Sequence, residues 1–91
     1  MVVTKEIVVK NKTGLHARPA AIFVQVANKY ESDITIAKED QEVNGKSIMG
    51  ILMLAAEKGA KVTITAEGDD AEAAAEELSK LLLHDIEPNS I

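Results

Sequence analysis

The chain has 91 residues, of which 46% are hydrophobic and 27% are charged, and these are the proportions of a globular protein with one hydrophobic core. We expect a single domain over residues 1–91, too short for a large enzyme. The formal net charge of −5 argues against nucleic acid as a direct partner. The absence of cysteine excludes disulfides and thiolate metal sites, and a cytoplasmic location is the default expectation.

The net charge is unevenly spread along the chain. Residues 67–91 hold eight acidic residues and one basic residue, whereas residues 1–30 hold five basic residues and one acidic residue. The basic first third therefore suits an anionic ligand or partner. The longest apolar stretch, residues 48–56, is far shorter than a membrane span, so we expect no membrane insertion.

The first half of the chain alternates strand and helix signals. β-Branched residues predict a strand over 2–9, which Gly14 follows as a breaker. Helical spacing predicts a helix over 17–29, with a proline tolerated in its first turn. Alternating polar and apolar residues over 33–36 then predict a strand, which a polar turn joins to a short strand near Val43 as a hairpin.

The second half begins with a short apolar helix. Ser47 is placed to cap a helix over 48–57, and Gly59 is placed to terminate it. Residues 62–66 alternate as a half-buried strand, which is typical of an antiparallel sheet with one covered face.

The last helix has the strongest amphipathic pattern. Asp69 and Glu72 resemble a capping box at its start. Its apolar stripe consists of Ala71, Ala74, Ala75, Leu78, Leu81 and Leu82, opposite a solvated face with Glu76, Glu77 and Lys80. The element order β-α-β-β-α-β-α, with three amphipathic helices, predicts a two-layer α+β fold with the helices on one sheet face.

Residues 14–20, Gly-Leu-His-Ala-Arg-Pro-Ala, place an imidazole at the start of a helix. The unpaired N–H groups and the dipole of a helix N-terminus favour an anion there, and the guanidinium of Arg18 suits a phosphate. The same dipole disfavours an imidazolium, so a neutral His16 nitrogen would be a nucleophile towards a phosphoryl group. Alternatively, His16 is a plain capping residue and Arg18 a solvated charge, and the spacing alone does not decide between these interpretations.

Two motifs in register carry a family resemblance. Residues 14–20, followed by Lys-Ser-Ile-Met-Gly at residues 46–50, resemble the HPr family, the histidine-containing phosphocarriers of the bacterial phosphoenolpyruvate-dependent sugar phosphotransferase system. The resemblance runs through nearly the whole chain and implies an open-faced β-sandwich, with a four-stranded antiparallel sheet in the order βαββαβα and three helices on one face. It also implies a carrier without cofactor or metal. Enzyme I would phosphorylate His16 on Nδ1, Arg18 would help to hold the group, and IIA components of sugar permeases would receive it.

Ser47 has two interpretations. One is a helix N-cap and nothing more. The other follows from residues 46–50, which resemble the low-GC Gram-positive type of HPr, in which HPr kinase/phosphorylase phosphorylates the matching serine and the product acts as corepressor of the catabolite control protein. The resemblance also implies a shared partner surface, although apolar helix residues are more often core than interface. This surface comprises Ala17, Ala21, Val24, Gln25, Asn28, Ile48, Met49 and Leu52.

Several alternatives remain at the level of sequence. The chain could be a regulatory or nitrogen-type paralogue, but the catabolite-repression relatives replace the histidine that His16 retains here. A KH-like nucleic-acid module or a plain interaction domain would fit the element order, yet the charge weighs against the former. Residues 45–47 match only the end of a P-loop, and residues 84–87 lack the spacing of a metal site. We further expect a basic island around His16, formed by Lys12, Arg18, Lys29 and Lys46.

Overall fold

The computed structural model describes residues 1–84. Seven elements follow the predicted order, with bounds that differ from the sequence expectation by a residue or a few. The strands are β1 (Val2–Val8), β2 (Asp33–Lys38), β3 (Gln41–Asn44) and β4 (Lys61–Glu67), and the helices are α1 (Ala17–Ala27), α2 (Ile48–Leu54) and α3 (Ala71–Leu83). The predicted α+β class is therefore confirmed.

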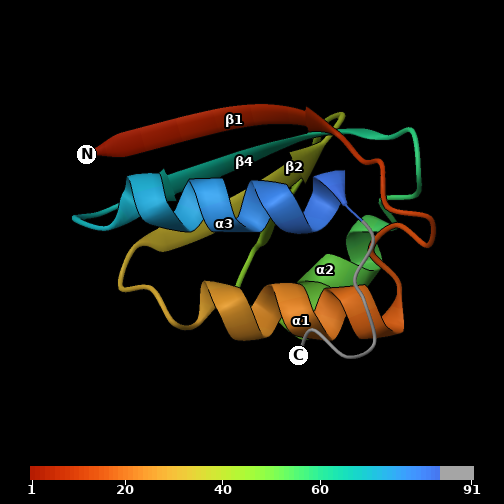
Figure 1. The fold of residues 1–91 in the computed structure, drawn as a ribbon, viewed down its shortest axis with the longest axis horizontal. Coiled ribbons are helices and arrows are strands. Elements are labelled where there is room, and N and C mark those ends of the chain that lie inside the picture. Colours follow the sequence, from red (N-terminus) through yellow and green to blue (C-terminus); the bar gives the residue numbers. More distant parts are fainter. Residues whose placement is uncertain (85–91) are drawn as a thin grey trace.

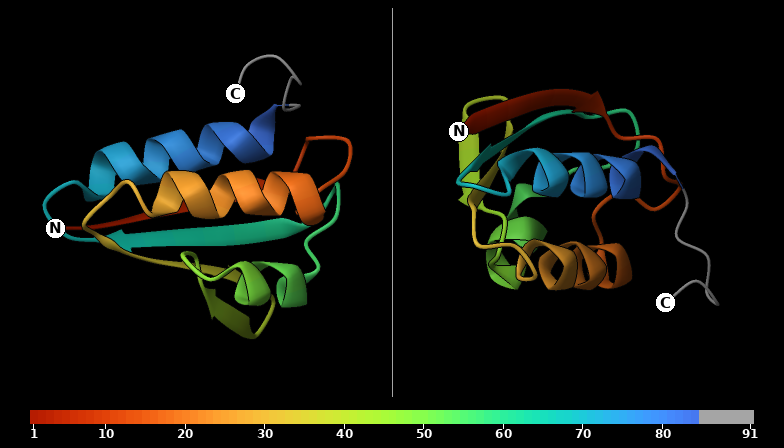
Figure 2. Two further views of the ribbon diagram at one scale, coloured as in Figure 1. Left: turned by 90° about the horizontal axis from the view of Figure 1, so that it is seen from below. Right: turned by 60° about the vertical axis from the view of Figure 1, so that its left-hand side comes forward.

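The four strands form one antiparallel sheet in the order β1-β4-β2-β3. Central β4 pairs with β1 on one side and with β2 on the other, so Thr65 faces both Thr4 and Thr35 in register. Figure 1 shows α1 and α3 lying side by side over the sheet, and Figure 2 shows the layers edge-on. Within residues 1–84 the second face of the sheet carries no helix, which makes the fold an open-faced β-sandwich.

The core lies between the sheet and the helices. Alternate residues of β2 and β4 point into it, because successive side chains of a strand face opposite sides of a sheet. Helix α3 contributes Ala71, Ala74, Ala75, Leu78 and Leu82 from its predicted apolar stripe, whereas Leu81 is half-buried. The other members of the core are Ile7, Val9, Leu15, Ala20, Phe23, Ala27, Ile34, Ile36, Ile51, Leu54, Ala56, Val62, Ile64 and Ala66.

Helix α2 ends three residues before the predicted Glu57. Ala55, with φ of 52°, takes the left-handed conformation that the sequence assigned to Gly59. Tertiary contacts favour this early end, because the Ala55 carbonyl accepts from Lys38 Nζ at 3.0 Å and the Ala56 carbonyl accepts from Leu15 N at 2.8 Å. Gly59 lies in the turn that follows.

The predicted capping box of α3 is wrong. Asp70, not Asp69, is the N-cap residue, and its side chain makes no capping hydrogen bond. Its carboxylate instead accepts from the backbone N–H groups of Glu31 and Ser32 and from the Ser32 hydroxyl. The tertiary contacts thus take the oxygens that a local cap would have used.

The described helices are too short to cross a membrane. The longest, α3, has 13 residues, against roughly 20 apolar residues for a bilayer span. No helix within residues 1–84 meets the length and hydropathy of a span. Of residues 84–87, only His84 lies within the described part of the chain.

Candidate functional site

His16 is the N-cap residue of α1, as the sequence predicted. Its backbone is extended, its carbonyl accepts the first helical hydrogen bond from Ala20 N at 2.7 Å, and its side chain makes no capping hydrogen bond. The residue is exposed. The first helical turn carries no acidic residue, so the positive end of the helix dipole lies beside an imidazole that is not used to cap the helix.

Arg18 lies on the exposed first turn of α1, two residues beyond His16. Pro19 follows it, and the proline ring lacks an N–H group at a position where helical N–H groups have no acceptor within the helix. The helix start therefore combines a guanidinium, an imidazole and the outward-facing N–H groups of a first turn. This combination suits an anion with several oxygens, such as a phosphoryl group.

The loop before His16 is held mainly by its backbone. The buried amide of Asn11 donates from Nδ2 to the Gly14 carbonyl at 2.9 Å, and Leu15 N donates to Ala56 O at 2.8 Å. Gly14 has φ of +63°, and a Cβ placed there would lie 2.5 Å from Ala56 O. The loop thus packs directly on the backbone that follows α2, which fixes the position of His16.

This packing creates an open pocket beside the imidazole. Its lining residues come from the loop before α1 and from the loop between α2 and β4. We call this the His16 pocket, and its residues are Lys12, Thr13, His16, Glu57 and Lys58. Sequence reasoning missed Thr13, which lies just before the motif at residues 14–20. It also missed Glu57 and Lys58, because about forty positions separate the two loops in the chain and neither loop carries a local motif for the contact.

The predicted basic island is only partly correct. Lys12 lies at the His16 pocket, but Lys29 and Lys46 lie at the opposite end of α1. Lys29 Nζ is 3.3 Å from Glu77 Oε2, and Lys46 Nζ donates to the Tyr30 carbonyl at 2.7 Å. An 11-residue helix is about 16 Å long. The ammonium groups of Lys29 and Lys46 therefore make tertiary contacts far from the imidazole of His16.

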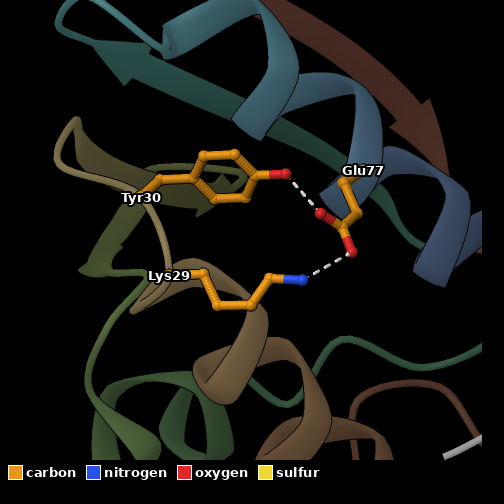
Figure 3. Close-up of polar contacts among 3 residues, drawn as sticks. All are labelled: Lys29, Tyr30 and Glu77. Carbon is orange, nitrogen blue, oxygen red and sulfur yellow. Dashed lines mark hydrogen bonds and ion pairs between the residues drawn. The ribbon is translucent and has the colours of Figure 1, made fainter.

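Figure 3 shows where Lys29 and Tyr30 converge on Glu77 of α3. The Tyr30 hydroxyl donates to Glu77 Oε1. Glu77 is therefore less exposed than the other two residues of the predicted solvated face, and 38% of its side chain is exposed. The clasp, as we call this network, ties the segment after α1 to α3. Its residues are Lys29, Tyr30, Ser32, Asp70 and Glu77.

The clasp changes the acidity of its members. Donation by the Tyr30 hydroxyl, followed by that of Lys29, lowers the pKa of Glu77, and the Ser32 hydroxyl lowers the pKa of Asp70. The same hydrogen bond, with the negative charge of Glu77 behind it, raises the pKa of Tyr30 to about 12. These shifts belong to a structural network, because they lie at the end of α1 away from His16.

Ser47 caps α2, as predicted. Its Oγ accepts from Gly50 N at 3.1 Å, and its carbonyl accepts from Ile51 N at 3.0 Å. Asn28 at the C-terminal end of α1 donates from Nδ2 to Lys46 O at 3.5 Å. Because Leu15 at the other end contacts Ala56, the two helices run antiparallel, and Ser47 and His16 lie at opposite ends of the pair.

The proposed partner residues share one surface. Positions 17, 21, 24, 25 and 28 of α1 recur at helical spacing and are exposed or half-buried. On neighbouring α2, Ile48, Met49 and Leu52 are 38%, 64% and 41% exposed. The sequence alternative, in which these apolar residues belong to the core, is therefore wrong for this part of α2. Met53, which the sequence did not assign to this surface, is also 66% exposed.

Known proteins are similar to this chain over most of its length. Residues 3–83 match the family described as "PTS HPr component phosphorylation site". The chain belongs to the HPr family. Among curated relatives, the HPr-like protein Crh of Bacillus subtilis is 44% identical over 84 residues, which cover 92% of this chain and 99% of that protein. The phosphocarrier protein HPr of Xylella fastidiosa strain 9a5c is 43% identical over 76 residues, covering 84% and 85%.

A solved structure supports the same assignment. The phosphocarrier protein HPr of Bacillus anthracis aligns with a TM-score of 0.87 and 52% identity, and the alignment covers 89% of this chain and 96% of that one. The matching family is a component of the phosphotransferase system, and the Xylella relative is named a phosphocarrier protein. The identity of the family thus agrees with the resemblance that residues 14–20 and 46–50 indicated.

Proposed function

We propose that this chain, acting as one domain in the cytoplasm, accepts a phosphoryl group on Nδ1 of His16 from enzyme I and passes it to IIA components of sugar permeases. The observation that carries this proposal is an exposed imidazole at the N-cap of α1 that makes no capping hydrogen bond. A carrier has to present the same residue to two successive partners, first to the donor and then to the acceptor, and an exposed helix terminus is accessible to both.

The transfer needs little covalent chemistry from the carrier. The Nδ1 lone pair of His16 attacks phosphorus while the P–N bond of the donor phosphohistidine breaks, and the bonding electron pair returns to the donor imidazole. Arg18 and the first-turn N–H groups of α1 stabilise the charge on the three phosphoryl oxygens. The same in-line arrangement, with His16 now as the donor, then transfers the group to the acceptor.

The surface formed by Ala17, Ala21, Val24, Gln25, Asn28, Ile48, Met49 and Leu52 would receive both partners. It adjoins the His16 end of α1, and flexible methionine side chains suit docking to more than one protein. Its two polar members, Gln25 and Asn28, are uncharged, so these eight residues add no electrostatic selection of their own.

Loading with enzyme I and phosphoenolpyruvate tests this function. The wild-type chain should gain one acid-labile, base-stable phosphate, and His16→Ala should gain none. Arg18→Ala should slow transfer in both directions by on the order of a hundredfold, whereas Lys5→Ala on β1 is the matched control for loss of a cation. A phosphate that persists in His16→Ala, measured by mass spectrometry, would exclude His16 as the acceptor.

We further propose that HPr kinase/phosphorylase phosphorylates Ser47 and that the product binds the catabolite control protein. The Ser47 hydroxyl is half-buried at the start of α2, beside exposed Ile48 and Met49. A phosphate at this helix N-terminus would be favourable for the helix, but it would place a charge of about −2 within an apolar docking surface. The modification would therefore weaken docking to enzyme I and create a new anionic epitope.

Incubation with the kinase and ATP tests this second role. Wild type should gain one phosphate, located at Ser47 by peptide mass spectrometry, and Ser47→Ala should gain none. The phosphorylated chain should then accept phosphate at His16 more slowly from enzyme I. A chain that takes no phosphate from the kinase, or takes it at another residue, would remove the regulatory role.

The similarity to the HPr-like protein Crh supports an alternative, in which the chain is a regulatory paralogue that does not serve sugar uptake. The same two assays separate the possibilities. Loading of His16 by enzyme I favours the carrier, whereas phosphorylation of Ser47 without any loading of His16 favours the regulator.

A further inference from the structure

The His16 pocket contains two charged residues of opposite sign that come from a loop outside both motifs. Glu57 and Lys58, between α2 and β4, line the pocket together with His16, Lys12 and Thr13. Both side chains are exposed. A phosphoryl group on His16 would therefore lie near Arg18 on the helix and near a second set of charged residues, Glu57 and Lys58, on the loop between α2 and β4.

The loop that carries these charges is held in place on both sides of the pair. Before them, Ala56 O accepts from Leu15 N at 2.8 Å, and Gly14 lies so close that an added Cβ would be 2.8 Å from Glu57 Cα. After them, Gly59 N donates to Val9 O and Val9 N donates to Ala60 O, both at 2.8 Å. These contacts keep the backbone of Glu57 and Lys58 in a fixed place relative to His16.

The charges of this loop have opposite consequences for a phosphohistidine. The phosphoryl group brings nearly two negative charges to a pocket whose lining residues include the basic Lys12 and Lys58 and the acidic Glu57. An ammonium favours the phosphorylated form, and a carboxylate disfavours it. Adjacent charges of opposite sign thus set how strongly the chain retains the group it carries.

We propose that Lys58 and Glu57 are positioning residues that tune the phosphoryl-transfer potential of His16: Lys58 stabilises the phosphohistidine and Glu57 destabilises it. This inference rests on the proposed function of His16. A carrier has to give up its group as readily as it accepts it. The ammonium of Lys58 stabilises the phosphohistidine, and the neighbouring carboxylate of Glu57 limits that stabilisation, so that the phosphoryl group can still be transferred onward.

An exchange equilibrium tests this directly. Phosphorylated, ¹⁵N-labelled wild type is mixed with an equal amount of unlabelled, unphosphorylated variant and catalytic enzyme I, and mass spectrometry measures the phosphate on each chain. Lys58→Gln should hold about two- to fivefold less phosphate than wild type, and Glu57→Gln should hold more by a similar factor. The double variant should approach wild type, and added salt should reduce both single effects.

Matched controls separate these local effects from net charge. Lys5→Gln on β1 and Glu72→Gln on α3 make the same charge changes at exposed positions outside the pocket, and both should share phosphate equally with wild type. Unfolding temperatures of all variants check that the fold is retained. Single variants that both equal wild type, or that both shift in the same direction, would overturn the proposal.

Failure of the carrier function has a different outcome. If enzyme I does not load wild type, phosphoramidate can place the phosphoryl group on His16 chemically, in a His84→Ala background that removes the second exposed histidine. Phosphorus NMR then measures the second ionisation of the phosphohistidine. Lys58→Gln should raise that pKa and Glu57→Gln should lower it, and unchanged values would overturn the tuning role independently of any partner.

Discussion

The two ends of α1 are held by different kinds of contact. At the His16 end, the backbone groups of Gly14 and Leu15 pack on the loop after α2, and the imidazole makes no capping hydrogen bond. At the other end, Tyr30 and Lys29 bind Glu77 through their side chains. A backbone-held end leaves its imidazole available to partners, whereas the side-chain clasp contributes stability where no chemistry is needed.

The strongest test of the backbone-held end is Gly14→Ala. The residue has φ of +63°, and its new Cβ would lie 2.5 Å from Ala56 O and 2.8 Å from Glu57 Cα. The left-handed conformation and the forced backbone shift should together destabilise the fold by about 2 to 4 kcal/mol in urea unfolding. Loading of His16 by enzyme I should slow as well.

Gly59→Ala is the matched control. It also has a positive φ, of +94°, but nothing lies within 4 Å of the added Cβ. Gly59→Ala should therefore lose only the free energy of the unfavourable backbone conformation, without a steric clash. Enzyme I should load His16 at nearly the wild-type rate. Equal losses in the two variants would mean that the contact with the loop after α2 does not hold the His16 end in place.

A milder change tests the clasp. Tyr30→Phe removes one hydroxyl that donates to a half-buried carboxylate, while Lys29 still contacts Glu77. The free energy of unfolding should fall by about 1 kcal/mol, and enzyme I should load His16 at the wild-type rate. A slower loading rate at unchanged stability would mean that the two ends of α1 are coupled.

Much of the fold was predictable from local patterns. The period-2 alternation of residues 62–66 and the apolar stripe of the last helix decided which faces are buried, because burial follows the geometry of each element. The predictions failed where a tertiary contact competed with a local signal. Asp70 binds the backbone of Glu31 and Ser32 and does not cap α3, and Ala55 ends α2 ahead of the glycine.

Only those residues of the candidate site that lie in continuous sequence motifs were predictable. His16, Arg18 and Ser47 lie in short motifs whose spacing relative to a helix start indicates their chemistry. The fold brings Glu57 and Lys58 to the same pocket, and no periodicity connects them to His16. The count of basic residues in the first third of the chain wrongly placed Lys29 in the basic island, because its partner Glu77 is 48 positions away in the sequence.

The clasp also makes the stability of the fold depend on pH. Because Glu77 has a pKa below its ordinary value of 4.5, its contribution is full above that pH and is lost as the pH falls through the lowered value. Because the pKa of Tyr30 rises from 10.0 to about 12, its contribution is full below pH 10 and is lost on the way to pH 12. Glu77→Gln should therefore reduce both the acid and the alkaline loss of stability.

Unfolding midpoints in urea between pH 3 and pH 11 measure this difference. Between pH 6 and pH 9 the gap between wild type and Glu77→Gln should be constant, because both groups keep one ionisation state there. Glu42→Gln, at an exposed position of β3, should follow wild type throughout. Some acid loss should remain in Glu77→Gln, since Asp70, with its own lowered pKa, still binds Ser32. A Glu77→Gln profile parallel to wild type at both extremes would show that the clasp carries no ionisation-linked stability.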